Sequence, residues 1–323
     1  MSPSPVASPD MDLRDTADRF FVQFPHPGNE HRPASDDMLW NAAPHGRKFL
    51  IAPGRYVDAA GQLAAAELVL WGEWEAPSRV EQRWPPSGQL PHVLHRPYWI
   101  TPRTTGFRQN TDPWVWGEQM LYSNCKQIFG AQQRATSMQR LGPGSVICFG
   151  STIGGEFCLD TVFVVASAEP WSPAKARELD ASEAFLTCTA EAVATGETDA
   201  AGGCMPNPIV CGPRDGEVEL TLYRSATVDA PIDGMYSLAP ASIADRGSAR
   251  FARPAIRLPD LINPASRQST RGSKDALTSE RVHVAWRSVV DQVLEAGLVL
   301  GVSFQTPRHR GGDHVIPTGS PSC

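Results

Sequence analysis

Short runs of apolar residues, broken by proline and glycine, recur along the chain and predict a protein built mainly of β-strands. The clearest pair is 145–149 and 157–165, and three glycines fall between them, so we expect an antiparallel hairpin there. Residues 76–113 are expected to be mostly loop. The other runs expected to form strands are 19–24, 47–52, 67–71, 217–223 and 298–304, with further candidates at 95–100 (an edge strand), 235–238 and 251–256.

A stretch near the C-terminal end has the spacing of an amphipathic helix. Apolar residues recur at helical intervals over 280–296, and Gly297 supplies a stop, so a helix is predicted there. The alanine-rich stretch 172–194 is also predicted to be helical. A shorter helix is predicted to begin after a capping residue near 125 and to end near 141.

Strands thus come in runs with few helices between them, which favours an α+β protein over a doubly wound parallel sheet. We expect a β-rich, mainly antiparallel sheet or a partly open barrel with a few peripheral helices. The segments expected along the chain are a disordered tail (1–18), a β-rich aromatic domain (19–170), a helical segment and linker (171–216), a second β-rich part packed on the first (217–306), and a loose tail (307–323).

Composition supports a folded protein outside the membrane. Hydrophobic residues make up 41% of the chain and charged residues 20%, which is enough for a sizeable core. No apolar run approaches the roughly 18 residues that a spanning helix needs, and the start of the chain lacks the pattern of a signal peptide. We therefore expect a cytoplasmic protein with no membrane partner.

Cysteine usage argues against a disulfide framework and against a zinc site. The chain has seven cysteines, an odd number, and no two of them form a CxxC pair. The sequence also lacks GxGxxG and GxxxxGK[ST], the glycine-rich motifs that bind dinucleotides and phosphates. No metal ion and no cofactor are therefore predicted.

Charge is unevenly distributed, although the net charge is only −6. Residues 79–140 and 246–281 each contain eight Lys/Arg against three Asp/Glu, whereas 155–236 contain four against fourteen. Local basic patches attract polyanions even in an acidic protein, and ordinary variation over a folded surface is the alternative. Arg253, in the second basic segment, is the candidate phosphate contact, because a guanidinium fork suits phosphate oxygens.

Residues 110–127 combine flat apolar side chains with hydrogen-bonding groups more densely than any other stretch of this length. Tryptophan and tyrosine rings can stack on a base, and amide and carboxylate groups can read its edge. The alternative is that these rings fill a β-rich core. The candidate ligand-binding residues are Asn110, Asp112, Trp114, Trp116, Tyr122, Asn124, Lys126 and Gln127.

Cys125 is the candidate nucleophile. A cysteine at a helix start, beside a lysine, can have a lowered pKa and react as the thiolate. It would need a partner base, and the sequence does not show which histidine comes near. An inert cysteine is the alternative reading.

His26, Glu30 and His31 form a compact loop of titratable groups and are the other candidate catalytic residues. They could supply acid–base chemistry or two or three metal ligands, and structural or exposed roles are the alternative. Glu73 and Glu75 are two residues apart and would share one face of a strand, which by itself implies no chemistry.

Residues 141–151, followed by 157–165, resemble a recurrent piece of PUA-like barrels, a superfamily that includes ASCH, EVE and YTH domains. In these domains a short helix leads through a glycine turn into a barrel hairpin. The resemblance implies binding of RNA or a modified base, with Trp114, Trp116 and Tyr122 as candidates for an aromatic cage. More loosely, the whole chain is similar to uncharacterised bacterial proteins grouped as nucleotide-modification-associated domains, which implies the same ligand class.

The function favoured by these patterns is recognition of a nucleotide or modified base, within a nucleic-acid modification or defence system. The expected partner is a nucleotide or nucleic acid. One alternative is an enzyme that acts on a nucleotide-like small molecule through Cys125 or the loop 26–31. Another is a structural or protein-interaction module whose tryptophans only fill the core.

Overall fold

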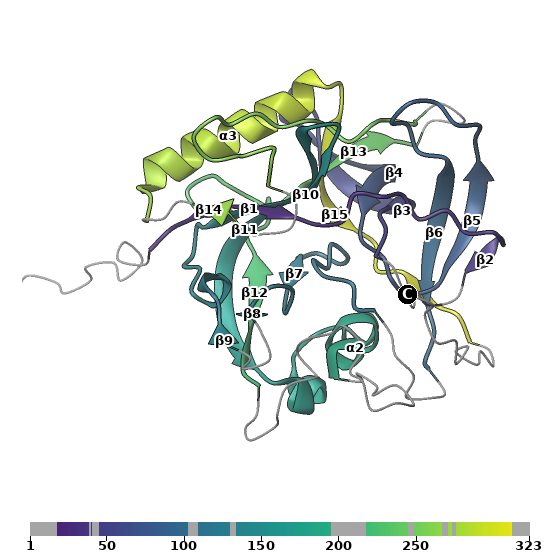
Figure 1. The fold of residues 1–323 in the computed structure, drawn as a ribbon, viewed down its shortest axis with the longest axis horizontal. Coiled ribbons are helices and arrows are strands. Elements are labelled where there is room, and N and C mark those ends of the chain that lie inside the picture. The colour runs from purple at the N-terminus through teal and green to yellow at the C-terminus, as the bar shows by residue number, and fades with distance from the viewer. Residues whose placement is uncertain are drawn as a thin grey trace, which may run out of the picture.

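Two β-sheets that share a hydrophobic core make up most of the molecule (Figure 1). The computed structural model describes residues 18–38, 40, 45–102, 109–129, 134–194, 218–244, 249–266, 271–272 and 276–311. The predicted linker at 195–216 and nearly all of the predicted tail at 1–18 lie outside these residues. The protein is α+β and rich in β-structure, as the apolar pattern predicted.

The first sheet has six strands in the order β14-β1-β10-β11-β12-β7. Of its neighbouring pairs, β1 and β10 run parallel and the others are antiparallel. The β10–β11 hairpin confirms the prediction for 145–165, and β11 continues beyond it to reach β12. The strand bounds are β14 Arg271–Gly272, β1 Phe21–Pro25, β10 Val146–Ile153, β11 Glu156–Trp171, β12 Leu220–Ser225 and β7 Leu121–Tyr122.

The second sheet has eight strands, in the order β15-β13-β4-β3-β6-β5-β2 with β16 beside β6. Strand β15 also pairs with β3, which closes a circuit of β3, β4, β13 and β15 and makes the sheet a partly closed barrel. The strand bounds are β15 Val299–Phe304, β13 Ala239–Ile243, β4 Leu63–Gly72, β3 Lys48–Val57, β6 Val93–Trp99, β5 Ser78–Arg83, β2 Asp37–Met38 and β16 Arg308–His309. A short pair, β8 Ile128–Phe129 and β9 Arg134–Ala135, stands apart from both sheets.

Glycine allows the circuit to close. A Cβ atom on Gly54 of β3 would lie 2.5 Å from the carbonyl oxygen of Ser303 on β15, closer than any real contact of this kind. The backbones of β3 and β15 can therefore approach only where the side chain is missing. Both sheets combine strands from 19–170 with strands from 217–306, so the two predicted β-rich parts share their sheets.

Helix α3 (Ser279–Glu295) confirms the helix predicted at 280–296 and covers the outer face of the six-stranded sheet (Figure 1). Its buried face includes Val282, Trp286 and Val289, which join a core cluster with Phe21 and Val146 of the sheet. The next residues of β1 and β10 point to the opposite side, into the core shared by both sheets. Strand alternation therefore gives this sheet two apolar faces.

The remaining helices are short. The stretch predicted as one helix at 172–194 is broken into a 3-10 helix, Pro173–Glu178, then α1 (Glu183–Phe185), a π-helical turn (Leu186–Ala190) and α2 (Glu191–Ala194). Leu179 is extended, and the Ser182 hydroxyl caps a new helix by accepting from the Phe185 N–H. Local capping thus overrides the alanine-rich composition.

Three further predictions of local structure are wrong. Residues 125–129 form a turn and the strand β8 instead of a helix start, and Ser137–Gln139 is a 3-10 turn. Neither of the candidate strands 235–238 and 251–256 forms a regular strand, and β13 begins only at Ala239. None of the helices in the described part of the chain combines the length and apolar character needed to span a bilayer.

The region 76–113 contains more strand than predicted, because β5 and β6 both lie in it. Strand β6 lies inside the sheet, between β3 and β5, rather than at an edge. Its pairing with β3 covers only Leu94 and His95. Pro97 in β6 and Pro53 in β3 lack the N–H groups that would extend this pairing, and the two strands separate beyond it.

The start of the predicted loose tail is part of the sheet. Arg308 and His309 of β16 pair in parallel with Tyr98 and Trp99 of β6, and the Arg310 N–H donates to the Trp99 carbonyl. The His309 ring also packs on the Trp99 ring, with centroids 4.3 Å apart. Residues 305–311 therefore belong to the folded structure, while 312–323 lie outside the described residues.

Candidate functional site

Buried charged side chains meet where β3 begins and β4 ends. Lys48 pairs with Gly72, so Arg47 and Glu73 lie next to each other just beyond the paired strands. Arg47 donates from Nη1 to Glu73 Oε2 (2.5 Å) and from Nε to Asp160 Oδ2 of β11 (2.9 Å). The Arg47 side chain is only 1% exposed. Such a cation requires carboxylate partners, because an unpaired charge is costly to remove from water.

His26, a predicted catalytic residue, joins this group from the end of β1. Its Nδ1 lies 2.7 Å from Glu73 Oε2. Burial lowers the pKa of His26 to about 4, although the Glu73 carboxylate opposes that shift. The ring is therefore neutral at pH 7, and Nδ1 carries its proton because a carboxylate only accepts. Nε2 keeps a lone pair, as in a histidine base oriented by a carboxylate.

Arg253, the predicted phosphate contact, is buried behind the same group. Its guanidinium donates to Ser151 Oγ (3.0 Å) and to the Gly28 carbonyl, and it lies 3.5 Å from Asp160 Oδ1. It also stacks on Trp71, 4.9 Å from the ring centroid. Its donors therefore serve the protein interior rather than a surface phosphate site.

His45 and Glu75 extend the group toward the surface. His45 Nδ1 lies 3.2 Å from Glu75 Oε1 and 4.0 Å from Glu73 Oε1. The carboxylates raise the pKa of His45 even though burial acts in the opposite direction. These two carboxylates and this imidazole could hold a cation. We call the following set the charged cluster: His26, His45, Arg47, Glu73, Glu75, Asp160 and Arg253.

Asp112 organises the predicted ligand-binding stretch from within. Its carboxylate accepts from the backbone N–H groups of Ser123 (3.0 Å), Asn124 (3.0 Å) and Cys125 (2.8 Å). Burial raises the pKa of Asp112 to about 7, while these N–H groups act in the opposite direction. The carboxylate thus holds a turn closed, which explains why residues 123–125 do not begin a helix.

Cys125 is held in the thiol form. Burial is the main reason that its pKa lies well above the ordinary value, and the negative charges of Asp112 and Glu73 add to the effect. Asn110 Nδ2 donates to Sγ over 3.8 Å. The structure thus places this cysteine in surroundings that oppose the thiolate, the reactive form that a nucleophile requires.

The predicted aromatic cage residues lie in the core. Trp114 and Trp116 are each 1% exposed, and both pack against Trp74 with ring centroids 5.7 and 5.5 Å apart. Tyr122 is fully buried, stacks on Tyr223 and donates its hydroxyl to the Cys125 carbonyl. These rings present no open stacking face here. Their positions agree with the alternative that they fill the core.

The polar residues of this stretch bond to one another or to neighbouring strands. Asn110 donates to Asn124 (2.9 Å), and Lys126 donates to the Pro25 carbonyl (2.6 Å). Gln127 bonds to both the N–H and the carbonyl of Thr221, which extends the edge of β12. The structure therefore gathers Asn110, Asp112, Asn124 and Cys125 at one turn, with Lys126 beside Phe24 of β1.

The side chains of the other two loop candidates contact β6 and the residue before it. The Glu30 carboxylate accepts from the backbone N–H groups of His92 (2.6 Å) and Val93 (3.0 Å), so it ties the loop to β6. His31 faces His95, with ring centroids 6.4 Å apart, and burial lowers its pKa to about 4. The three predicted catalytic residues of this loop therefore have three different environments.

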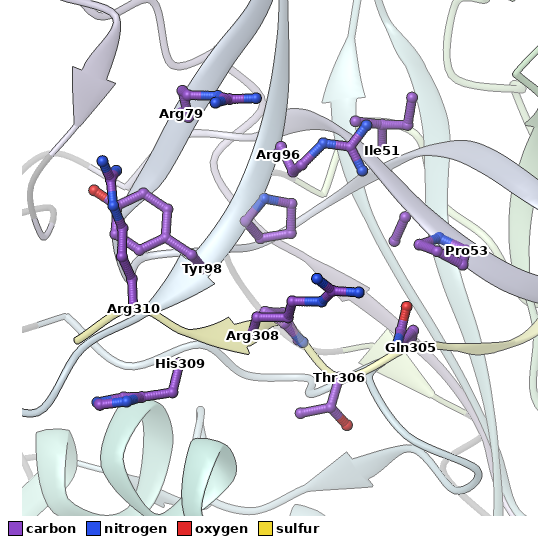
Figure 2. A pocket seen from close by; sticks show the side chains of 13 residues that line it. Ile51, Pro53, Arg79, Arg96, Tyr98, Gln305, Thr306, Arg308, His309 and Arg310 are labelled. Atoms are coloured by element: carbon purple, nitrogen blue, oxygen red, sulfur yellow. The ribbon is translucent and has the colours of Figure 1, made fainter.

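A cavity of about 570 Å³ opens where β3 and β6 separate (Figure 2). The middle of β3 and the end of β6 line one part of it, and residues 305–310 line another. Figure 2 shows Arg79 and Arg96 reaching in from β5 and β6, and Arg308 reaching from β16 toward the side of Pro53 and Gln305. We call this space the arginine cavity. It is lined by Ile51, Ala52, Pro53, Arg79, Arg96, Pro97, Tyr98, Gln305, Thr306, Pro307, Arg308, His309 and Arg310.

Cations outnumber carboxylates around the arginine cavity. Arg96 bridges Glu67 (2.9 Å) and Glu81 (3.1 Å), and Arg79 also contacts Glu81 (2.6 Å). Arg310 lies over the Tyr98 ring, 5.1 Å from its centroid. Among the residues that the structure describes, no carboxylate forms an ion pair with Arg308. The described lining of the cavity thus contains four arginines and no carboxylate side chain, which favours a positive field inside it.

The arginine cavity was not predicted from the sequence. Arg79 and Arg96 fall in the first basic segment, so the local excess of positive charge was a usable signal. Arg308 and Arg310 fall in the stretch predicted to be a loose tail. Only the pairing of β16 with β6 brings the two groups together across more than 200 residues of chain.

No protein-family model matches the chain, and neither the curated proteins nor the solved structures contain a match.

Proposed function

We propose that this protein binds a nucleotide-type ligand in the arginine cavity, with the phosphate groups held by arginine side chains. The observation that carries the proposal is the convergence of Arg79, Arg96, Arg308 and Arg310 on one cavity. Arginine presents a planar fork of N–H donors that matches phosphate oxygens and stays charged at all physiological pH values. The ligand class agrees with the function favoured by the sequence.

The size and remaining lining of the cavity support this ligand class. A volume of about 570 Å³ falls within the range of ordinary small-molecule sites, roughly 300–1,000 Å³. Gln305 and Thr306 add uncharged hydrogen-bonding groups beside the arginines. Such groups can bond to a sugar or a base edge, which a site for inorganic phosphate alone would not need.

Arg308 is the residue of choice for a test, because it lies on an exposed strand and has no ion pair to a described carboxylate. Binding of AMP and ATP is measured by isothermal titration calorimetry, and binding of a fluorescein-labelled single-stranded 12-mer by anisotropy. We expect Arg308→Ala to weaken binding of the nucleotide ligand by about tenfold, the loss of one charge-assisted hydrogen bond. Arg308→Lys should recover only part of the loss, because the fork is missing.

Arg281→Ala is the matched control, since Arg281 is an exposed arginine on α3, on the outer face of the other sheet. It should bind as the wild type does. The proposal is wrong if the wild type binds none of these probes, as a purely structural module would. Inorganic phosphate binding as tightly as every nucleotide would also overturn it.

A further inference from the structure

We propose that His45, Glu73 and Glu75 form a binding site for one divalent transition-metal ion of the manganese or zinc type. The three side chains each offer a ligand atom, and these atoms all lie within 4.8 Å of one another. His45 Nδ1 is 3.2 Å from Glu75 Oε1 and 4.0 Å from Glu73 Oε1. In a tetrahedral site with bonds of about 2.1 Å, ligand atoms lie about 3.4 Å apart. The two separations lie on either side of that value.

The second observation that supports the metal site is the orientation of the Glu73 carboxylate, which is set by hydrogen bonds from residues behind it. Glu73 Oε2 is occupied by Arg47 Nη1 (2.5 Å) and His26 Nδ1 (2.7 Å). Both bonds fall on the same oxygen, so the other oxygen, Oε1, is turned toward His45. The nearest donor to Oε1 in a hydrogen bond is the Asp112 N–H, at 3.5 Å. On this 2%-exposed side chain, Oε1 therefore accepts one long hydrogen bond and lies 4.0 Å from His45 Nδ1, on the side of the proposed metal position.

This arrangement matches the way proteins support metal ligands. Carboxylate ligands are themselves hydrogen-bonded by an outer layer of residues, which fixes their orientation. Arg47 and His26 take that place behind Glu73. Arg47 is fixed in turn by Asp160, so the support is built from residues of β11 as well as from the β3–β4 hairpin.

Burial and ligand chemistry indicate the kind of ion. Glu73 and Glu75 are buried, whereas 40% of the His45 side chain is exposed, so an ion can enter from the His45 side. Three protein ligands leave at least one coordination position for water or a ligand. One imidazole nitrogen with two carboxylate oxygens suits Mn²⁺, Fe²⁺ or Zn²⁺ better than soft ions that prefer thiolates.

Manganese is the better probe, because the seven cysteines of the chain could bind zinc elsewhere. The full-length protein is stripped with EDTA, dialysed against MnCl₂ without nucleotide, and its bound metal is counted by mass spectrometry. We expect one Mn²⁺ per chain. The electron paramagnetic resonance signal of free Mn²⁺ gives the affinity.

Two substitutions test the assignment. His45→Ala removes the accessible ligand, and Glu75→Gln keeps the size and one oxygen of the buried ligand while removing its charge. Each should weaken Mn²⁺ binding by tenfold or more, while circular dichroism reports an intact fold. His283→Ala on α3 is the control and should bind as the wild type does. No bound Mn²⁺ in the wild type, or equal binding in His45→Ala and the wild type, would overturn the inference.

The metal site is independent of the proposed nucleotide site, and the two tests separate them. The arginine cavity is lined by the middle of β3, from Ile51 to Pro53, whereas the metal ligands lie beyond the start of β3 and the end of β4. Arg308→Ala should leave Mn²⁺ binding unchanged. His45→Ala should leave binding of a metal-free nucleotide unchanged.

Discussion

The charged cluster and the arginine cavity both concentrate arginine, but they use it in opposite ways. In the cluster, Arg47 is 1% exposed, and two carboxylates of the same chain accept its hydrogen bonds. In the cavity, Arg308 is exposed and has no such partner among the described residues. Desolvation explains the difference, because a buried guanidinium must be paired within the fold, whereas a solvated one can keep its donors for a ligand.

This difference separates a stability role from a binding role. Removing a partner from the cluster leaves another charge buried without compensation. Removing the Arg308 side chain from the cavity leaves only water in its place. The two regions should therefore respond to the same type of substitution with different observables.

The largest effect is expected for Arg47→Met. The substitution leaves Glu73 and Asp160 without their shared cation, and breaking a buried ion pair in this way costs about 3–5 kcal/mol. Urea unfolding followed by circular dichroism measures the loss. A change below about 1 kcal/mol, the range of exposed ion pairs, would show that the cluster is better solvated than its burial indicates.

The same measurement on Arg308→Ala should show almost no change in the free energy of unfolding, within about 0.5 kcal/mol. Binding of a nucleic-acid strand should instead weaken, and the slope of log affinity against log salt should fall by about one if Arg308 contacts a phosphate. A large loss of stability without a change in the salt slope would make Arg308 a structural residue and remove the contrast between the two regions.

Acid should destabilise the protein through buried neutral histidines near β3. Burial lowers the pKa of His95 to about 3, against an unfolded value near 6.5, so the unfolded state binds the proton first as pH falls. The stability contributed by neutral His95 is complete above pH 6.5 and is lost as pH falls from there toward 3, by at most about 1.4 kcal/mol per pH unit.

Urea unfolding of the wild type and His95→Gln between pH 7.5 and 4.5 measures this contribution. The variant should lose less stability over that range. A residual slope is expected from His31, whose pKa is also lowered. Parallel curves for the two proteins would show that His95 has the same pKa in the folded state as in the unfolded state, and would contradict the lowered pKa.

The smallest effect concerns Cys125, beside the charged cluster. Because its pKa is raised, its alkylation by iodoacetamide at pH 7.5 should be slower than that of a free cysteine peptide. Peptide mass spectrometry at timed intervals measures the rate for this position. Alkylation of Cys125 faster than that of the free peptide would support the prediction that Cys125 is a nucleophile.

Local patterns in the sequence were enough to predict the fold class, the β10–β11 hairpin and helix α3. Each depends on a period of two or 3.6 residues and on nearby glycines, so neighbours along the chain supply the information. The same reasoning singled out 110–127 as a dense polar and aromatic stretch. It could not decide that Trp114 and Trp116 face inward, since a large ring suits a core and a ligand pocket equally well.

Tertiary structure alone decided which charges meet. Arg47 reaches Glu73 through the register of β3 and β4, and Asp160 joins from another sheet. Arg308 reaches the neighbourhood of Arg96 because β16 pairs with β6. Which charged side chains pair depends on their distance and burial, and both are set by contacts between residues far apart in the sequence. Hydrophobic periodicity, in contrast, can be read from each segment alone.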